Sequence, residues 1–224
     1  MPEMLDALHE AKRPVALTGA GISAPSGVPT FQTDWKGRPV RDFLGRDTYR
    51  HDPVEFFELF CSMEAWCRAE PNAAHLALAG LSVPVITQNI DGLHQKAGSK
   101  RVIELHGNLR RMICRSCGHR ASAEDFCHAL RPLYGAKDHN GILQAIQCPR
   151  CGARMDTDVV LYDDPVRGLE EAVDLLMDAD LLVVIGTSLQ TYPAAALPDI
   201  VRERGRRVLV EDHDCIAALT EQES

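Results

Sequence analysis

The sequence has neither a long hydrophobic run nor a long basic segment. No apolar run reaches the roughly 20 residues that a membrane-spanning helix needs. Acidic and basic residues are interspersed in a chain whose formal net charge is −8, so no basic arm is available for a phosphate backbone. We therefore expect that neither a membrane nor a nucleic acid is a partner of this protein.

A secretory signal is also missing from the first residues. Residues 1–13 mix charges with spaced Leu and Met, which is typical of an amphipathic helix, whereas a signal needs an unbroken apolar stretch. This pattern predicts a cytoplasmic protein. The chain has eight cysteines, and in that compartment paired cysteines at short spacing bind metal more often than they form disulfides.

Short apolar runs alternate with helical segments along most of the chain. Strands are expected at residues 14–18, 83–87, 101–105, 159–162, 181–185 and 207–210. Helices are expected at residues 52–68, 72–80, 168–179 and 193–204. This alternation predicts an α/β fold with a parallel sheet covered on both faces. Residues 25–51 show no clear period and are interpreted as a long loop.

Small and polar residues follow four of the expected strands, where an open parallel sheet binds its ligands. GAGISA at 19–24 fits the G-x-G-x-x-(G/A) pattern, in which missing side chains let a pyrophosphate approach a helix N-terminus. QNID at 88–91 could hold a ribose and a carboxamide, and GTS at 186–188 suits a phosphate or ribose contact. ELHG at 104–107 offers a general base. Each motif alone also fits a purely structural turn.

Two C-x-x-C pairs indicate a zinc site. Cys114 and Cys117 form the first pair, Cys148 and Cys151 the second, and each pair supplies one edge of a tetrahedral Zn²⁺. Four thiolates leave no open position on the metal, so the zinc is structural. A redox C-x-x-C is the alternative, but it does not explain a second copy. The other cysteines, which have no such spacing, are expected to be ordinary thiols: Cys61, Cys67, Cys127 and Cys215.

Taken together and in this order, the motifs resemble the sirtuin family. The similar segments are GAGISAPSGVPTF at 19–31, TQNIDGLHQKAG at 87–98, ELHG at 104–107, both cysteine pairs and GTSLQTYPAAALP at 186–198. The resemblance implies a Rossmann-like NAD-binding domain, at residues 1–107 and 158–224, with an inserted zinc-ribbon module at 108–157. It also implies an NAD-dependent protein-lysine deacylase that acts on an acyl-lysine peptide, most simply a deacetylase.

The resemblance also implies roles for individual residues. In the family's reaction the acyl oxygen attacks the nicotinamide ribose, nicotinamide leaves, and a His base deprotonates a ribose hydroxyl, which yields free lysine and O-acyl-ADP-ribose. The residues that match the family's NAD-binding positions are Gly19, Ala20, Gly21, Ser23, Thr30, Phe31, Gln88, Asn89, Ile90, Asp91, Gly186, Thr187, Ser188 and Glu211. His106 and Asn89 match catalytic positions, and Val160, Leu161 and Tyr162 match the strand that binds acyl-lysine.

Some positions depart from the family pattern. Gln32 stands where an Arg is usual, and Gln has neither the charge nor the fork of a guanidinium. Asp163 replaces a Gly beside the substrate strand, and Glu211 replaces an Asn of the last strand. Two other functions stay open: an ADP-ribosyltransferase or NADase, and a weakly active NAD-binding regulatory module. Gln32 and Asp163 are the departures that keep the regulatory module open.

Overall fold

The computed structural model describes residues 2–30, 33–162 and 164–211, and these residues form two compact units. Unit 1 comprises residues 1–30, 69–106 and 166–224, and unit 2 comprises residues 31–68 and 107–165. Residues 31–68, which the sequence analysis assigned to the NAD-binding domain, thus pack with the cysteine-bearing segment. None of the helices in the described ranges is long and apolar enough to cross a membrane.

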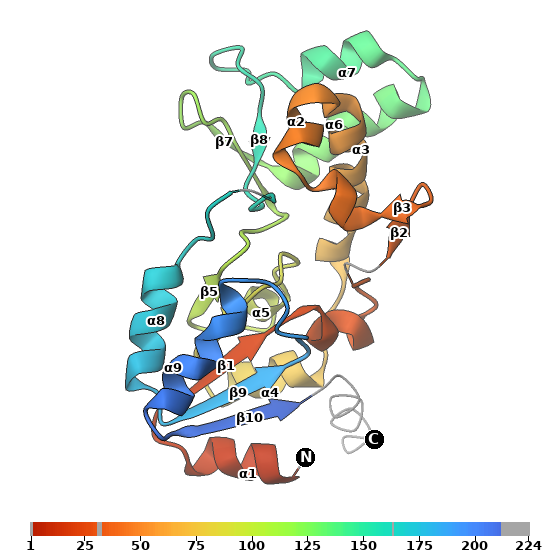
Figure 1. The fold of residues 1–224 in the computed structure, drawn as a ribbon. Coiled ribbons are helices and arrows are strands. Elements are labelled where there is room, and N and C mark those ends of the chain that lie inside the picture. The colour runs from red at the N-terminus through yellow and green to blue at the C-terminus, as the bar shows by residue number, and fades with distance from the viewer. Residues whose placement is uncertain (1, 31–32, 163, 212–224) are drawn as a thin grey trace. The chain divides into compact units, whose positions relative to one another are not determined.

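Unit 1 is built on a five-stranded parallel sheet in the order β10-β9-β1-β4-β5, which confirms the predicted parallel α/β fold (Figure 1). The strands are β1 (Pro14–Thr18), β4 (Val85–Thr87), β5 (Val102–Glu104), β9 (Leu181–Ile185) and β10 (Arg207–Glu211). The helices are α1 (Pro2–Glu10), the 3₁₀ helix η1 (Ala20–Ser26), α4 (Ala73–Gly80), α5 (Leu93–Lys96), α8 (Leu169–Asp178), η4 (Ala194–Ala196) and α9 (Leu197–Glu203).

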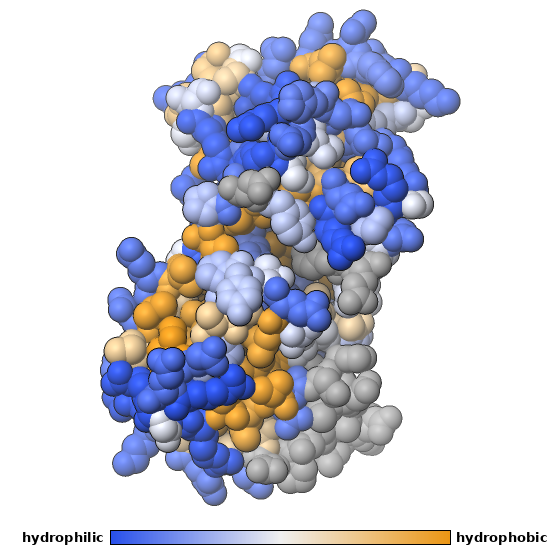
Figure 2. Space-filling model, in the orientation of Figure 1, coloured by the Kyte–Doolittle hydropathy of each residue, from blue (hydrophilic) through white to orange (hydrophobic). Residues whose placement is uncertain are grey.

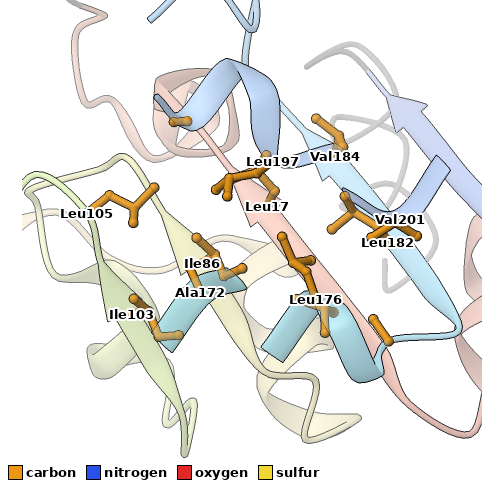
Figure 3. Close-up of a cluster of buried hydrophobic side chains, with 13 residues drawn as sticks. Leu17, Ile86, Ile103, Leu105, Ala172, Leu176, Leu182, Val184, Leu197 and Val201 are labelled. Carbon is orange, nitrogen blue, oxygen red and sulfur yellow. The ribbon is translucent and has the colours of Figure 1, made fainter. Parts of the chain in front are cut away.

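Helices cover both faces of this sheet, because successive apolar side chains of the strands point to opposite faces. In β9, Leu182 and Val184 pack with α8 and α9 (Figure 3), whereas Val183 and Ile185 pack on the side of α1 and α4. All five residues of β9 are buried, so the strand has no polar face. The apolar run at 181–185 is therefore the centre of a core with two layers of helices.

Unit 2 contains a three-stranded antiparallel sheet and several helices. The sheet has the order β7-β6-β8, formed by β6 (Arg111–Ile113), β7 (Arg120–Ser122) and β8 (Asp156–Thr157). The other elements are β2 (Asp34–Trp35), β3 (Arg38–Pro39), η2 (Val40–Phe43), α2 (Arg46–His51), α3 (Pro53–Met63), η3 (Glu64–Arg68), α6 (Ala123–Gly135) and α7 (His139–Ala145). The long loop predicted for residues 25–51 thus contains a short hairpin and two helical segments.

Helix α3 begins as its sequence predicts. Asp52 precedes Pro53, and its side chain accepts a hydrogen bond of 3.0 Å from the backbone N–H of Glu55. The helix then buries Phe56, Phe57 and Phe60 in unit 2, where the Phe57 and Phe126 rings lie 5.3 Å apart. Because Phe126 belongs to α6, this contact holds α3 against α6.

Two expectations for unit 2 are wrong. Cys61 of α3 and Cys127 of α6 are joined in a disulfide, with Cα atoms 5.2 Å apart, because the packing of the two helices brings together residues 66 positions apart. Residues 159–162 do not form a strand of the parallel sheet. Among the described residues, their one β-bridge is that of Tyr162 with Gly45, and Tyr162 donates its N–H to the Leu44 carbonyl at 3.0 Å.

Candidate functional site

The carboxyl ends of the parallel strands bring the predicted motifs of unit 1 to one edge of the sheet. Thr18 at the end of β1 is in register with Thr87 of β4 and Ile185 of β9, and Thr87 is in register with Glu104 of β5. The segments that follow these strands are 19–24, 88–91, 105–107 and 186–188. The structure therefore gathers the four motifs at the edge where parallel sheets bind their ligands.

Two glycine-bearing loops lie in contact at this edge. The N–H of Gly21 donates to the Gly186 carbonyl at 2.8 Å. A Cβ atom on Gly19 would lie 2.5 Å from Cβ of Thr187, and one on Gly21 would lie 2.7 Å from Cα of Gly186. The glycines of GAGISA are thus required by the close approach of the two loops, whether or not a diphosphate lies against them.

Buried hydrogen bonds fix the polar residues of the second motif. Asn89 donates from Nδ2 to the Gly19 carbonyl and to Oγ of Ser23, both at 3.1 Å. Ser23 donates to Asp91 at 2.8 Å, and Asp91 accepts the N–H of Leu93 at 2.9 Å. Because both Nδ2 hydrogens are used, Asn89 can offer a ligand only its amide oxygen. The side chains of Ser23, Asn89 and Asp91 therefore form a rigid polar surface, called here the polar floor.

His106 stands beside this floor in a defined tautomer. Its Nδ1 lies 3.0 Å from the backbone carbonyl oxygen of Gln88. A carbonyl can only accept, so Nδ1 carries the hydrogen and the lone pair is at Nε2. Burial lowers the pKa of His106 below its usual 6.5, although the Gln88 hydrogen bond partly offsets this. The imidazole is therefore neutral at neutral pH and can accept a proton at Nε2.

The remaining predicted residues of unit 1 lie around the same strand ends. Thr187 Oγ1 accepts from Gln88 Nε2 at 3.1 Å and from the N–H of Leu189 at 3.2 Å. Glu211 ends β10 and its backbone carbonyl accepts from Gly186 at 3.2 Å. The others are buried Ile90, half-buried Ala20 and Thr30, and exposed Ser188. Phe31, Gln32 and Asp163 lie outside the described residues, and Val160, Leu161 and Tyr162 belong to unit 2.

A buried pair of histidines, which the sequence does not predict, lies beneath the site. His75 and His94 have ring centroids 4.8 Å apart, and both residues are at most 1% exposed. His94 Nε2 contacts Thr18 Oγ1 at 2.9 Å, and because Thr18 donates to Thr87, the histidine must be the donor here. Nothing in a single sequence distinguishes such a histidine from a solvent-exposed one.

We expect this pair to destabilise the protein at acidic pH. Burial lowers the pKa of His75 to about 4, and burial together with His75 lowers the pKa of His94 to about 3. Below 6.5 the unfolded chain therefore binds more protons, so the free energy of unfolding falls as the pH falls from 6.5 towards 4. Between about pH 7 and pH 5 the loss should be roughly 2–4 kcal/mol.

Urea titrations at both pH values test this expectation. His94→Gln should lose less stability between the two pH values than the wild type, because it removes one of the protons taken up on unfolding. His128→Gln is the matched control, since His128 is exposed on α6. Equal losses for the wild type and His94→Gln would show that His94 does not titrate on unfolding.

The two cysteine pairs of unit 2 converge on a candidate metal centre. The four Sγ atoms lie within 4.8 Å of one another, with Cys114 and Cys151 3.5 Å apart and Cys117 and Cys148 3.7 Å apart. A tetrahedral Zn²⁺ with Zn–S bonds of about 2.3 Å has S···S edges of about 3.8 Å. The sulfur atoms therefore fit a Cys₄ zinc site, as the spacing predicts.

The backbone repeats the same turn at both cysteine pairs. The Gly118 N–H donates to the Cys114 carbonyl at 2.8 Å, and the Gly152 N–H donates to the Cys148 carbonyl at 2.9 Å. Both glycines have a positive φ, 71° and 75°, which only glycine adopts without strain. The glycine after each pair thus lets the chain turn so that two sulfur atoms face one point.

Comparison with known proteins agrees with this geometry. Residues 19–193 match the Sir2 family. An NAD-dependent protein deacylase of Thermococcus kodakarensis is 40% identical over 90% of this chain and 80% of its own, and an NAD-dependent protein deacetylase of Saccharolobus solfataricus is 39% identical over 88% and 78%. A solved Sir2 with a p53 peptide and NAD+ has a TM-score of 0.81 at 36% identity, covering 95% of this chain and 86% of the other. The protein therefore belongs to the Sir2 family.

Proposed function

We propose that the protein is an NAD-dependent protein-lysine deacylase that produces nicotinamide, O-acyl-ADP-ribose and free lysine. The observation that carries this proposal is the neutral His106 beside the Asn89–Asp91 floor, in a chain of the Sir2 family. Related proteins are named deacylases and deacetylases, and solved Sir2 structures of 36% identity hold acetylated and propionylated peptides.

The residues at the strand ends of unit 1 would bind NAD. Gly19, Ala20, Gly21 and Ser23 would surround the diphosphate, Gln88 a ribose, and residues 186–188 with Glu211 the adenosine half. Asn89, Ile90 and Asp91 would form the nicotinamide pocket, and Thr30 and Phe31 match the family's cofactor loop. Bound NAD would supply a ribose carbon that becomes electrophilic as nicotinamide leaves. The fixed Asn89 and Asp91 side chains would orient this ribose without reorganising.

His106 would act as the general base. Its Nδ1–H donates to Gln88, which fixes the ring, and its Nε2 is available to take a proton from a ribose hydroxyl. Because only neutral His106 can accept this proton, the pKa of His106 sets the pH below which the rate of deacylation falls.

We therefore expect an acid limb below pH 6.5 in the rate profile. His106 must be neutral to accept a proton, and its lowered pKa keeps it neutral down to pH values under 6.5. The value of kcat/KM should stay level from mildly alkaline pH to 6.5 and decrease only below it. Steady-state rates with a peptide that has no group titrating in this range measure the limb. A midpoint at or above 6.5 would contradict the proposed environment of His106.

Residues 160–162 would bind the acyl-lysine peptide. The N–H groups of Leu161 and Tyr162 are used within unit 2, by Asp164 at 3.2 Å and Leu44 at 3.0 Å. In the described part of the chain, the N–H and C=O of Val160 have no such partner. Val160 could therefore pair with an extended peptide backbone.

Incubation with NAD and an acetyl-lysine peptide, read by mass spectrometry, tests the proposed function. O-acetyl-ADP-ribose together with free lysine is the expected result. ADP-ribosylated protein, or ADP-ribose formed without peptide, would instead indicate a transferase or NADase. Unchanged NAD from a protein that binds it would indicate a regulatory module.

Location in the cytoplasm and the lack of a nucleic-acid partner remain part of this proposal. The net charge of −8 supports the second. The Cys61–Cys127 disulfide is an observation against a reducing compartment, because disulfides are rare there.

A further inference from the structure

Unit 2 contains a cavity of about 540 Å³ that is rich in charged side chains. Its lining includes four arginines, Arg46, Arg50, Arg115 and Arg154, but only two carboxylates, Asp156 and Asp164. The cavity thus has a surplus of two positive charges in a chain whose net charge is −8. The visible face around α2, which carries Arg46 and Arg50, is largely hydrophilic (Figure 2).

The two carboxylates are already occupied. Asp164 accepts two hydrogen bonds from Arg46, at 2.7 and 2.6 Å, in the fork arrangement of a bidentate pair. Asp156 is 2% exposed and accepts from Arg46 at 2.7 Å, from Arg115, and from the N–H of Thr157 at 2.8 Å. Neither carboxylate is left to neutralise another cation.

Donors, by contrast, remain free. Toward the described residues, Arg154 donates only from Nη1, to the backbone carbonyls of Tyr49 at 2.8 Å and Arg50 at 3.3 Å. Arg115 donates from Nε, and both of its Nη groups have no partner within that part of the chain. Among the described residues, the exposed Arg50 side chain has no hydrogen bond or ion pair. Free guanidinium donors with surplus positive charge are suited to a carboxylate or a phosphate.

The cavity is connected to the segment proposed to bind the substrate. Asp164, which Arg46 holds, also accepts the N–H of Leu161 at 3.2 Å. One wall of the cavity is therefore fixed to residues 160–162. An acyl-lysine peptide paired with this segment would extend past the arginines, and a side chain near its acyl-lysine could enter the cavity.

We propose that this cavity binds an acidic side chain of the protein substrate, either Asp or Glu or a phosphorylated Ser, close in sequence to the acyl-lysine. This inference rests on the proposed deacylase function. It makes Arg50 and Arg154 specificity-determining residues, which select among acyl-lysine sites by their neighbours and take no part in the chemistry.

A peptide series tests the inference. Each acetyl-lysine peptide carries either Glu or Gln at one position near the lysine, and deacetylation of each pair is compared. At one or two positions we expect Glu to lower KM about three- to tenfold with little change in kcat. The effect is moderate because the ion pair between the peptide carboxylate and an arginine of the cavity is partly exposed. Added salt should reduce this preference, because it screens exposed charges.

Variants of the cavity separate its charge from the fold. Arg50→Gln should reduce the Glu preference, and Arg50→Gln with Arg154→Gln should abolish it, while kcat on the Gln peptides stays unchanged. Arg41→Gln is the matched control, because Arg41 carries the same charge, is 65% exposed and does not line the cavity. Melting temperatures of all variants check that the fold is intact.

The outcomes distinguish this inference from the proposed function. Equal KM values for Glu and Gln at every position, on a protein that still deacetylates the neutral peptides, would overturn the cavity assignment alone. No turnover of any peptide, with NAD unchanged, would overturn the deacylase and the inference together. A third arm adds phosphate or citrate without peptide: a rise in melting temperature that Arg50→Gln removes, without any peptide preference, would overturn the substrate assignment and indicate a free-anion site.

Discussion

Replacing His106 with alanine is expected to abolish deacylation while NAD still binds. Removal of a general base typically costs about 10²–10⁴-fold in rate. The described residues at the strand ends of unit 1 offer no second imidazole in this position, since His75 and His94 are buried and their Nε2 atoms are already engaged. Asp91 is buried, and its two oxygens hold Ser23 and the N–H of Leu93 in place.

The measurement pairs turnover with binding. Initial rates with acetyl-lysine peptide should fall by at least about 10²-fold in His106→Ala, and calorimetric titration should give a Kd for NAD close to that of the wild type. His9→Ala is the matched control, since His9 is exposed on α1 in the same unit and should leave both quantities unchanged. Turnover within a few-fold of the wild type would remove His106 from the mechanism.

The sheet of unit 1 could be predicted because its signals are local. Residues 181–185 are apolar throughout, and this short apolar run is enough to predict a strand that is buried on both faces. The parallel order then fixes where the segments after the strands lie. Gln88 and Gly186 meet at one edge for this reason, and the motif residues of unit 1 could be assigned to a common site before any coordinates were known.

What the sequence did not reveal depends on contacts between distant segments. Cys61 and Cys127 have no motif spacing, and only the packing of α3 on α6 brings them together. The same holds for the ion pairs of Arg46, whose partners Asp156 and Asp164 lie more than a hundred residues away along the chain. Residues 31–68 likewise join the cysteine-bearing segment through such contacts, and no local pattern signals their partner.

Purified protein is expected to contain one Zn²⁺ per chain, and Cys114→Ser is expected to lose it. Apparent binding free energies of structural zinc are about 10–16 kcal/mol in small zinc-binding peptides, which is comparable to or larger than the net stability of about 5–15 kcal/mol of most domains. Cys114 is fully buried, and its Sγ lies 3.5 Å from that of Cys151, so a serine oxygen there would weaken the metal site without filling the same space.

The loss of stability in Cys114→Ser should be concentrated in unit 2, since all four ligands belong to this unit. Two of the ligands flank the turn that follows β6. Elemental analysis gives the zinc content, and hydrogen exchange shows which segments open. Exchange should rise in residues 107–165 far more than in β1 and β9.

Cys67→Ser is the matched control, because Cys67 lies outside the cluster and this variant should keep its zinc. If the wild type contains no zinc, or if Cys114→Ser retains it, the proposed Cys₄ zinc site is wrong. Zinc in the wild type and the control but not in Cys114→Ser, together with faster exchange in unit 2 of Cys114→Ser, would establish that this metal stabilises unit 2. Four thiolates give the metal no open position for catalysis.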